Sequence, residues 1–476
     1  MNAKQVSYLK IGQHRGNQRI WLEGKRLEAC GFTRGASYTT IFDVPGRRLL
    51  VKVDEKGDRI VSGRTNEEAF TPIIDICNAG VSQHLVQVMG GPVRVRAVFR
   101  SGIIEITVHE HERRQKEREE RIKTHASTAT VSVGTTCAGG GISCWALHEG
   151  LKDSGIHGVA EFILDMEGKY LQNAIDNNPF VTKETRIFEA SLEEMDLEFL
   201  PQVDILNSSL PCTGFSKSGR AKNRLQNPES HESAGTAILG FLKIVEAVNP
   251  AIIINENVPT FSSSATCDLL RGYLQKLGYR IQERVLGRQM GGALESRDRH
   301  ILVAVSSGLG NWDIEQIVAS MPTPVALSEV LEDIPADDPV WKEYQYLAEK
   351  ENRDRKAGKG FRRQLLTGNE SSCGTIGRGY NKGRSTEPFL VSPVDPTKSR
   401  LFTVAEHCRV KGIPEAAVNG QNSTVAHEIL GQSVLFGVFK SIGRFVGSLT
   451  ADLVNCAPIL PWPKKIYQIQ LSLFAA

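Results

Sequence analysis

The feature that most constrains the fold is a series of short apolar segments between Thr130 and Val305, each followed by a polar residue or a glycine turn. Apolar runs of this length, separated by helix-like stretches, are typical of buried parallel strands in an α/β domain. Such a sheet binds its ligands beyond the carboxyl ends of its strands, so the polar residues there are the candidates for function. The predicted strand segments are Val131–Val133, Gly158–Glu161, Arg186–Ser191, Asp204–Leu206, Ala251–Asn255, Arg280–Leu286 and His300–Val305.

Cys212 follows Pro211 in the loop after the predicted strand Asp204–Leu206. An isolated cysteine is most often a small buried core residue. The loop around Cys212 is polar and contains glycine, so it lacks the continuous apolar face that a core position needs. We therefore expect Cys212 to be a nucleophile, provided that other residues of a catalytic site accompany it.

Two segments suit a nucleoside cofactor. Thr136–Ser143 places a glycine run between a predicted strand and a predicted helix, where bare backbone lets a ligand approach the helix N-terminus. Alone, such a run is weak evidence for a ligand, and a structural turn is the more common explanation. Glu161 ends the second predicted strand, and a carboxylate there is placed to accept hydrogen bonds from both ribose hydroxyls.

Three charged residues complete the candidate catalytic set. Glu256 follows the fully apolar strand Ala251–Asn255, and a carboxyl group at the end of a buried strand is costly unless it is paired or functional. Arg297 and Arg299 enter the strand His300–Val305, and their alternating spacing places both on one side of the chain.

Composition sets the broad class of the protein. At 476 residues the chain exceeds what one hydrophobic core normally holds, so we expect two or three domains. Its 9 cysteines contain no CxxC pair, which favours reduced thiols in the cytoplasm over a disulfide framework or a zinc site. We expect neither a signal peptide nor a membrane span. The net charge of +3 is too small to indicate a nucleic-acid partner by itself.

Residues 1–108 are predicted to form a β-rich module in which one order of strands occurs twice, so that two half-copies close a pseudo-symmetric unit. The stretch Ile20–Val53 is faintly similar to the swapped-hairpin toxins of the SymE and AbrB type. That similarity implies nucleic-acid backbone contacts, which a solvated basic surface on a targeting or dimerisation module explains equally well. The residues concerned are Arg15, Arg19, Lys25 and Arg26.

Two charged segments lie outside this strand pattern. His109–His125 carries opposite charges at three- and four-residue spacing with almost no apolar stripe, which predicts a solvated helical linker. Trp341–Arg363 is predicted to be a charged helix. The loop Gly374–Arg384 combines arginine, lysine, glycine and one tyrosine, a composition that suits phosphate contacts and base reading.

From about Thr130 to Val446 the chain resembles the DNA cytosine-5 methyltransferase family, because several blocks occur in the family's order. Thr136–Ser143 is similar to the first cofactor block, and Glu161 with Tyr170 and Asn173 to the second. The remaining blocks are the Pro-Cys loop Asn207–Ser216, the Glu-Asn-Val block Glu256–Val258, the Arg-x-Arg strand Ser296–Arg299, the ninth motif Arg400–Pro414 and the tenth motif Gly431–Val434.

The resemblance implies a Rossmann-like class I S-adenosylmethionine-dependent methyltransferase fold with an inserted target-recognition domain, next to the separate N-terminal β-rich domain. It implies these divisions: module 1–108, linker 109–128, catalytic domain 129–305, target-recognition domain 306–398, return to the catalytic domain 399–449 and tail 450–476. It also implies a bacterial or phage enzyme of the kind found in restriction-modification, a monomer that acts on double-stranded DNA.

The resemblance assigns roles to individual residues. S-adenosyl-L-methionine would be bound by Thr136, Cys137, Gly139, Gly140, Gly141, Ile142, Glu161, Ser191 and Ser433. DNA would be contacted by Ser216, Lys217, Arg378, Tyr380, Lys382 and Arg384.

The reaction that the resemblance implies needs no metal ion. The Cys212 thiolate adds to carbon 6 of a flipped-out cytosine, and carbon 5 then takes the methyl group. Glu256 acts as the acid at ring nitrogen 3, while Arg297 and Arg299 hold the ring carbonyl and the loop. Six positions depart from the family's usual Phe, Gly, Pro, Gln, Gln and Asn, namely Thr136, Ala138, Leu210, Thr213, Glu295 and Gln432.

Two other functions fit the same residues. An RNA cytosine methyltransferase would use the same catalytic set, although a sizeable separate target-recognition interval favours DNA. A non-catalytic protein that binds nucleic acid through its N-terminal module and a decayed methyltransferase fold is the other alternative.

Overall fold

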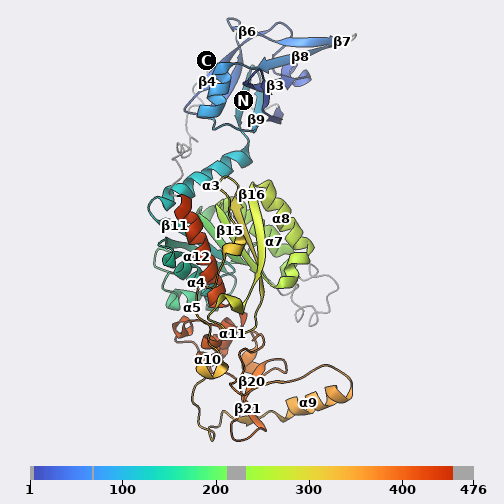
Figure 1. Ribbon diagram of the computed structural model, residues 1–476. Coiled ribbons are helices and arrows are strands. Elements are labelled where there is room, and N and C mark those ends of the chain that lie inside the picture. The colour runs from blue at the N-terminus through green and yellow to red at the C-terminus, as the bar shows by residue number, and fades with distance from the viewer. Residues whose placement is uncertain (1–4, 67–68, 212–231, 454–476) are drawn as a thin grey trace. The chain divides into compact units, whose positions relative to one another are not determined.

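Residues 5–66, 69–211 and 232–453 are described by the computed structural model. The chain divides into two units, one ending at Glu117 and one beginning at Arg118 (Figure 1). Each unit has its own hydrophobic core, as expected for a chain of this length.

The first unit contains a six-stranded sheet of order β1-β9-β10-β5-β4-β6 and a four-stranded sheet of order β2-β3-β8-β7. Its elements are β1 (Gln5–Lys10), β2 (Gly12–His14), β3 (Asn17–Glu23), α1 (Lys25–Glu28), β4 (Ser37–Asp43), β5 (Arg48–Val53), β6 (Arg59–Ile60), β7 (Ser62–Asn66), β8 (Ala69–Ile76), α2 (Ala79–Gln83), the short helix η1 (His84–Val88), β9 (Arg94–Arg100) and β10 (Ile103–Val108).

The pairing of these strands confirms the predicted pseudo-symmetry. The order β3-α1-β4-β5 recurs as β8-α2-β9-β10. Strand β3 pairs antiparallel with β8, and β5 pairs antiparallel with β10, as two equivalent halves require. The similarity to swapped-hairpin toxins stays a prediction.

Two of the four basic residues proposed to contact nucleic acid are held within the module. Arg19 forms a two-pronged ion pair with Asp75, at 2.8 and 2.9 Å. Arg26 donates to the Glu23 carbonyl and to the Ser7 hydroxyl, and its guanidinium lies over the Phe99 ring. These contacts favour a structural role for both.

Helix α3 (Glu110–Ala126) is the predicted linker, but its second half is not solvated. Arg118 is 2 % exposed and donates to Ser306 Oγ at 2.9 Å, while Glu119 accepts from the Gly308 N–H. Ile122 and Ala126 lie in the core of the second unit. The linker prediction is therefore wrong for this half, because its charges satisfy polar groups of the sheet.

The second unit is built on a seven-stranded sheet of order β13-β12-β11-β14-β15-β17-β16, in which β17 runs antiparallel to its neighbours. This is the predicted α/β architecture. Its elements up to the end of the sheet are β11 (Thr130–Thr136), α4 (Ile142–Asp153), β12 (His157–Asp165), α5 (Gly168–Asn177), β13 (Arg186–Glu189), η2 (Leu197–Phe199), β14 (Ile205–Ser209), α7 (Glu232–Val248), β15 (Ile252–Asn257), η4 (Pro259–Ser263), α8 (Ala265–Lys276), β16 (Tyr279–Leu286), η5 (Arg288–Met290) and β17 (Arg299–Ser306).

Helices cover both faces of this sheet because its strands are apolar on both sides. Ile252 and Ile254 of β15 pack in the cluster that contains α4 and α12 (Phe436–Asp452), and Ile253 packs in the cluster that contains α7 and α8. Figure 1 shows these helix pairs on opposite sides of the sheet. Gly150 and Gly443 let α4 and α12 touch, since a Cβ on Gly150 would lie 2.1 Å from the Lys440 carbonyl.

A smaller region follows β17 and contains a four-stranded sheet of order β18-β21-β20-β19. The predicted helix Trp341–Arg363 is shorter here, because Trp341 is buried with its indole N–H on the Pro335 carbonyl. The elements that follow β17 in the chain, up to the return to the large sheet with α12, are η6 (Ile314–Gln316), η7 (Leu327–Glu329), β18 (Lys342–Glu343), α9 (Gln345–Lys356), β19 (Gln364–Leu366), η8 (Tyr380–Lys382), β20 (Pro388–Val391), β21 (Lys398–Arg400), α10 (Val404–Val410), η9 (Glu415–Val418), α11 (Ser423–Gln432) and α12.

Within the described ranges, no single helix has the length and apolar composition to cross a membrane. Helices α11 and α12 meet that criterion only as a pair bent by 49°, on length and composition alone.

Candidate active site

The carboxyl ends of β11, β14 and β15 lie side by side, because these strands are parallel and in register from Thr136 through Ser208 to Asn255. Several buried polar atoms at this edge find no hydrogen-bond partner among the described residues. They are Thr136 Oγ1, Asn207 Oδ1, Ser208 Oγ and both side-chain amide atoms of Asn255. Buried polar groups are normally paired, so this cluster suits a polar ligand.

The glycine turn after β11 has the backbone that the sequence predicted. Cys137, Gly139 and Gly141 all have positive φ, at 52°, 51° and 82°. Gly140 is required for another reason, since a Cβ there would lie 2.4 Å from the side chain of Ile429 in α11. The turn passes directly into α4 at Ile142, leaving its backbone next to a helix N-terminus, as a bound cofactor requires.

The acidic residue at the tip of the second strand is Asp165, and the prediction of Glu161 for that place is wrong. Strand β12 continues through the apolar run after Glu161, which lies inside it at a register irregularity. Asp165 accepts from the N–H groups of Gly139, at 2.7 Å, and Glu167, at 3.0 Å. Burial raises the pKa of Asp165, and these hydrogen bonds oppose the shift.

Of the other residues in the cofactor prediction, Asn173 supports this turn, whereas the hydroxyls of Ser191 and Ser433 bond within their own segments. The Asn173 amide donates to the carbonyls of Gly140, at 3.2 Å, and Ala417, at 2.9 Å. Ser191 follows β13 and exchanges hydrogen bonds with Glu194. Ser433 ends α11, with its hydroxyl on the Leu430 carbonyl.

The loop predicted to carry the nucleophile begins at the next strand end. Leu210 is buried, and its carbonyl accepts from the Asn257 side chain at 3.2 Å. This bond ties the start of the loop to β15. Cys212, Ser216 and Lys217 lie outside the described residues.

Glu256 and Arg299 form an ion pair at 2.8 Å, with Glu256 8 % exposed. They come together because Glu256 in β15 pairs with Ile301, two residues after Arg299 in β17. The arrangement puts a carboxyl group and a guanidinium at the sheet edge, next to the anchored loop.

Arg297 does not share the partner of Arg299. It precedes β17 and donates to Glu295 Oε1 and to the Ile376 carbonyl, both at 3.2 Å. The strand alternation that predicted a shared side begins only at Arg299, so the two arginines serve different contacts.

Residues 146–448 match the family model of C-5 cytosine-specific DNA methylases, which covers more than half of the chain. The chain belongs to this family. It is 27% identical to the Type II methyltransferase M.NlaX of Neisseria lactamica over 53% of this chain and 79% of that protein. It is 23% identical to the Type II methyltransferase M.HhaI of Haemophilus parahaemolyticus over 55% of this chain and 80% of that one.

The fold agrees with this membership. The crystal structure of the S. pombe Dnmt2 methyltransferase superposes with a TM-score of 0.52 at 18% identity, over 68% of this chain and 99% of that one. The chain is a DNA cytosine-5 methyltransferase, and its family implies S-adenosylmethionine as the methyl donor.

The methyltransferase also has a partly buried charge network that joins α8, β16 and β17. Both oxygens of Glu283 bind Arg271, at 2.6 and 2.7 Å, and one also lies 2.6 Å from His300 Nε2. Burial alone would raise the pKa of Glu283, but hydrogen bonds from Arg271 and His300 lower it to about 2. Cys267, Glu283 and His300 have the spacing of a metal site. Because Arg271 already binds both oxygens of the Glu283 carboxylate, we interpret these residues as structural. They hold β16 and β17 together.

The loop Gly374–Arg384 is only partly available to DNA. Tyr380 is fully buried, donating to the Pro388 carbonyl and accepting from the Phe402 N–H, so its prediction as a DNA contact is wrong. Arg378 points to the cofactor side, 5.5 Å from the Tyr170 ring centre. The exposed basic residues of the loop are Arg378, Lys382 and Arg384.

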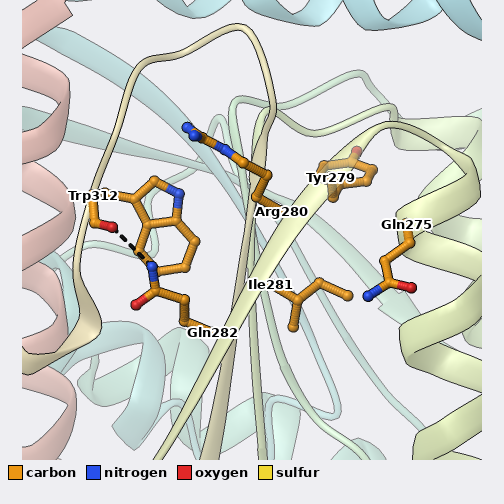
Figure 2. Close-up of a pocket in the computed structure, with 6 residues that line it drawn as sticks. All are labelled: Gln275, Tyr279, Arg280, Ile281, Gln282 and Trp312. Atoms are coloured by element: carbon orange, nitrogen blue, oxygen red, sulfur yellow. Dashed lines mark hydrogen bonds between the residues drawn. The ribbon is translucent and has the colours of Figure 1, made fainter.

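A cavity of about 380 Å³ lies at the other end of the edge strand β16 (Figure 2). Tyr279 pairs there with Ser306, whereas Leu286 pairs with Arg299 at the catalytic end. Gln282 closes one side by donating to the Trp312 carbonyl at 2.8 Å. The cavity is therefore separate from the site of methyl transfer.

Proposed function

We propose that this methyltransferase acts on a cytosine flipped out of double-stranded DNA, with Cys212 as nucleophile and Glu256, Arg297 and Arg299 as its supporting catalytic set. The observation that carries the proposal is the ion pair between Glu256 and Arg299 at the end of β15, beside the Asn257 contact that anchors the loop leading to Cys212. A cytosine inside a duplex cannot reach such a pocket, so base flipping is required.

S-adenosylmethionine, when bound, supplies the electrophilic methyl group. For its site we propose Thr136, Cys137, Gly139, Gly140, Gly141, Ile142, Ser191 and Ser433, with Asp165 in place of Glu161. The support is the fit of the residues at one sheet edge: a turn with positive φ, buried polar atoms without a partner in the part of the chain that the structure describes, and a half-buried carboxylate.

The roles of the catalytic residues follow from the chemistry of cytosine. The Cys212 thiolate forms a bond to carbon 6 and pushes electron density to carbon 5, the atom that is methylated. Glu256 donates a proton to ring nitrogen 3, and Arg299 holds both Glu256 and the ring carbonyl. After transfer, a base removes the carbon 5 proton, the bond from Cys212 to carbon 6 breaks and the nitrogen 3 proton returns to Glu256, which restores the ring, the thiolate and the acid.

We propose that Lys382 and Arg384 contact the DNA backbone from the target-recognition domain and that Ser216 and Lys217 do so from the nucleophile loop. Arg378 is proposed for the cofactor side. The support is charge and exposure, which suit phosphate contacts. We further propose a monomer on DNA in the cytoplasm of a bacterium or of a phage's host.

The decisive experiment is covalent trapping on duplex DNA that contains 5-fluorocytosine, because fluorine at carbon 5 prevents the release of the nucleophile. The wild-type chain and Cys77→Ser, a control in the first unit, should form a complex that survives denaturing electrophoresis. Cys212→Ser should form none while still binding S-adenosylhomocysteine. An adduct with Cys212→Ser would refute the nucleophile.

RNA is the second candidate substrate, because a tRNA (cytosine(38)-C(5))-methyltransferase of Schizosaccharomyces pombe is 24% identical over 55% of this chain. Methyl transfer to duplex DNA and to tRNA should be compared at equal concentration. We expect DNA to be the better substrate, and faster transfer to tRNA would reverse the assignment.

A further inference from the structure

Lys411, the residue that ends α10, is a fully buried lysine at the junction of three segments. Its ammonium group donates to Glu295 Oε2 at 2.6 Å and to the Ser433 carbonyl at 3.2 Å. Burial, with help from Arg297, lowers the pKa of Lys411 to about 7, and Glu295 opposes that shift. A buried ammonium group is costly, so its two acceptors must compensate.

The first segment that Lys411 holds contains Glu295 and lies on the side of the site proposed to bind the target base. Glu295 is also fully buried, and its other oxygen accepts from the Ile376 N–H at 2.9 Å and from Arg297 at 3.2 Å. Arg297 in turn donates to the Ile376 carbonyl. The carboxylate thus fixes Arg297 to the start of the loop Gly374–Arg384.

The second segment that Lys411 holds contains Ser433 and lies on the side of the site proposed to bind the cofactor. Ser433 caps the C-terminus of α11 directly after Gln432, and the same helix presses Ile429 against Gly140 in the glycine turn. A bond to the Ser433 carbonyl therefore fixes the end of the helix that supports this turn. Glu295 stands where the family usually has Gln, so this chain has a carboxylate opposite Lys411.

We propose that Lys411 is a positioning residue that couples the two sides of the site, holding Arg297 and the Ile376 backbone through Glu295 and the glycine turn through Ser433. The inference rests on the proposed cofactor and target sites. It predicts that the two couplings can be separated by substitution.

The test compares Lys411→Met, Glu295→Gln and the double variant. In Lys411→Met both links are broken. The value of kcat/KM for DNA should fall about 100-fold through misplacement of Arg297 and the loop. Affinity for S-adenosylhomocysteine, measured by calorimetry, should weaken about tenfold for one lost charged hydrogen bond.

The double variant should recover DNA kinetics but not cofactor affinity. The amide introduced by Glu295→Gln can still accept from Ile376 and Arg297 without leaving an unpaired buried charge, whereas the thioether introduced by Lys411→Met has no proton to donate to the Ser433 carbonyl. Glu295→Gln alone should keep wild-type affinity for S-adenosylhomocysteine, because Lys411 still holds Ser433. Lys152→Met, at an exposed position of α4, is the matched control.

A merely structural role would give a different pattern. DNA KM and S-adenosylhomocysteine affinity would then change together in proportion to the loss of thermal stability, and that result would overturn the inference. If Lys411→Met does not fold, Glu295→Gln and the double variant decide, since equal cofactor affinity in these two would also overturn it. If the wild-type enzyme formed no covalent complex with 5-fluorocytosine DNA, that result would refute the proposed function instead.

Discussion

Asp204 and Glu256 are two buried carboxylates at opposite ends of neighbouring strands, and they have very different surroundings. Asp204, just before β14, accepts from Arg121 at 3.1 Å, from His125 at 2.6 Å and from both the N–H and the hydroxyl of Ser132 at 2.9 Å. Among the described residues, Glu256 has Arg299 as its one ion-pair partner. A saturated carboxylate stabilises the fold, whereas one with spare acceptor capacity can bind a substrate.

Glu256→Gln should have the largest effect and should act on catalysis. The amide keeps the size of the side chain but cannot donate a proton as an acid, so kcat should fall about 100-fold to 10,000-fold. The midpoint of thermal unfolding should change little. Glu198→Gln, at an exposed position of η2, is the control and should match wild type.

Asp204→Asn should show the reverse behaviour. Arg121 and His125 would lose their carboxylate, and breaking a buried ion pair costs about 3 kcal/mol of unfolding free energy. Urea unfolding would measure that loss, and kcat per folded molecule should remain near wild type. A lower kcat at unchanged stability would show that Asp204 acts in catalysis and would contradict the comparison with Glu256.

Asp165→Asn tests the corrected end of β12. Loss of a charged hydrogen-bond acceptor for a ribose hydroxyl should weaken S-adenosylhomocysteine binding about tenfold to 100-fold. Glu161→Gln, four residues earlier in the same strand, should leave the affinity near wild type. If Glu161→Gln had the larger effect, the carboxylate would have to be reassigned.

His125→Gln should give the smallest effect, and it should depend on pH. The hydrogen bond to Asp204 raises the pKa of His125 above 6.5, so its stabilisation is present below 6.5 and is lost as pH rises through the raised value. Burial would raise the pKa of Asp204, but its partners lower it below 3.8, so its contribution is lost only as pH falls through that lower value.

At pH values between the lowered pKa of Asp204 and the raised pKa of His125, the unfolding free energy of the wild type should be about 0.5 kcal/mol larger than that of His125→Gln. The difference is small because His125 is partly exposed. Unfolding in urea at several pH values would measure this difference. A difference that persists at pH 9 would show that the charge of His125 contributes nothing.

Predictions that depend on short stretches of sequence are confirmed in several places. All seven strands of the large sheet were predicted. Apolar runs identified central strands such as β15, because a strand buried on both faces must be apolar along its length, whereas the edge strands β13 and β16 are polar and only partly buried. The glycines of Thr136–Ser143 predicted the turn before α4, because positive φ favours glycine.

Other predictions failed because they depended on where a segment ends or on what packs against it. β12 continues past Glu161, since Phe162, Ile163 and Leu164 are also buried. Tyr380 was predicted to face DNA from its basic neighbours, yet its ring and hydroxyl are enclosed by the hydrophobic cluster that also contains Trp341 and Phe402. The continuation of β12 did have a local signal, the apolar run Phe162–Leu164 before Asp165, whereas the burial of Tyr380 had none within a few residues.

The sequence by itself determined the order of strands and helices, the glycine turn and the identities of the catalytic candidates, because these depend on residue types over short stretches. Only the tertiary structure decided that Arg299 takes Glu256 while Arg297 takes Glu295, and that Lys411 lies between Glu295 and Ser433. The physical reason is that the stability of a buried charge depends on partners brought close by folding, in the case of Lys411 and Glu295 from positions 116 residues apart.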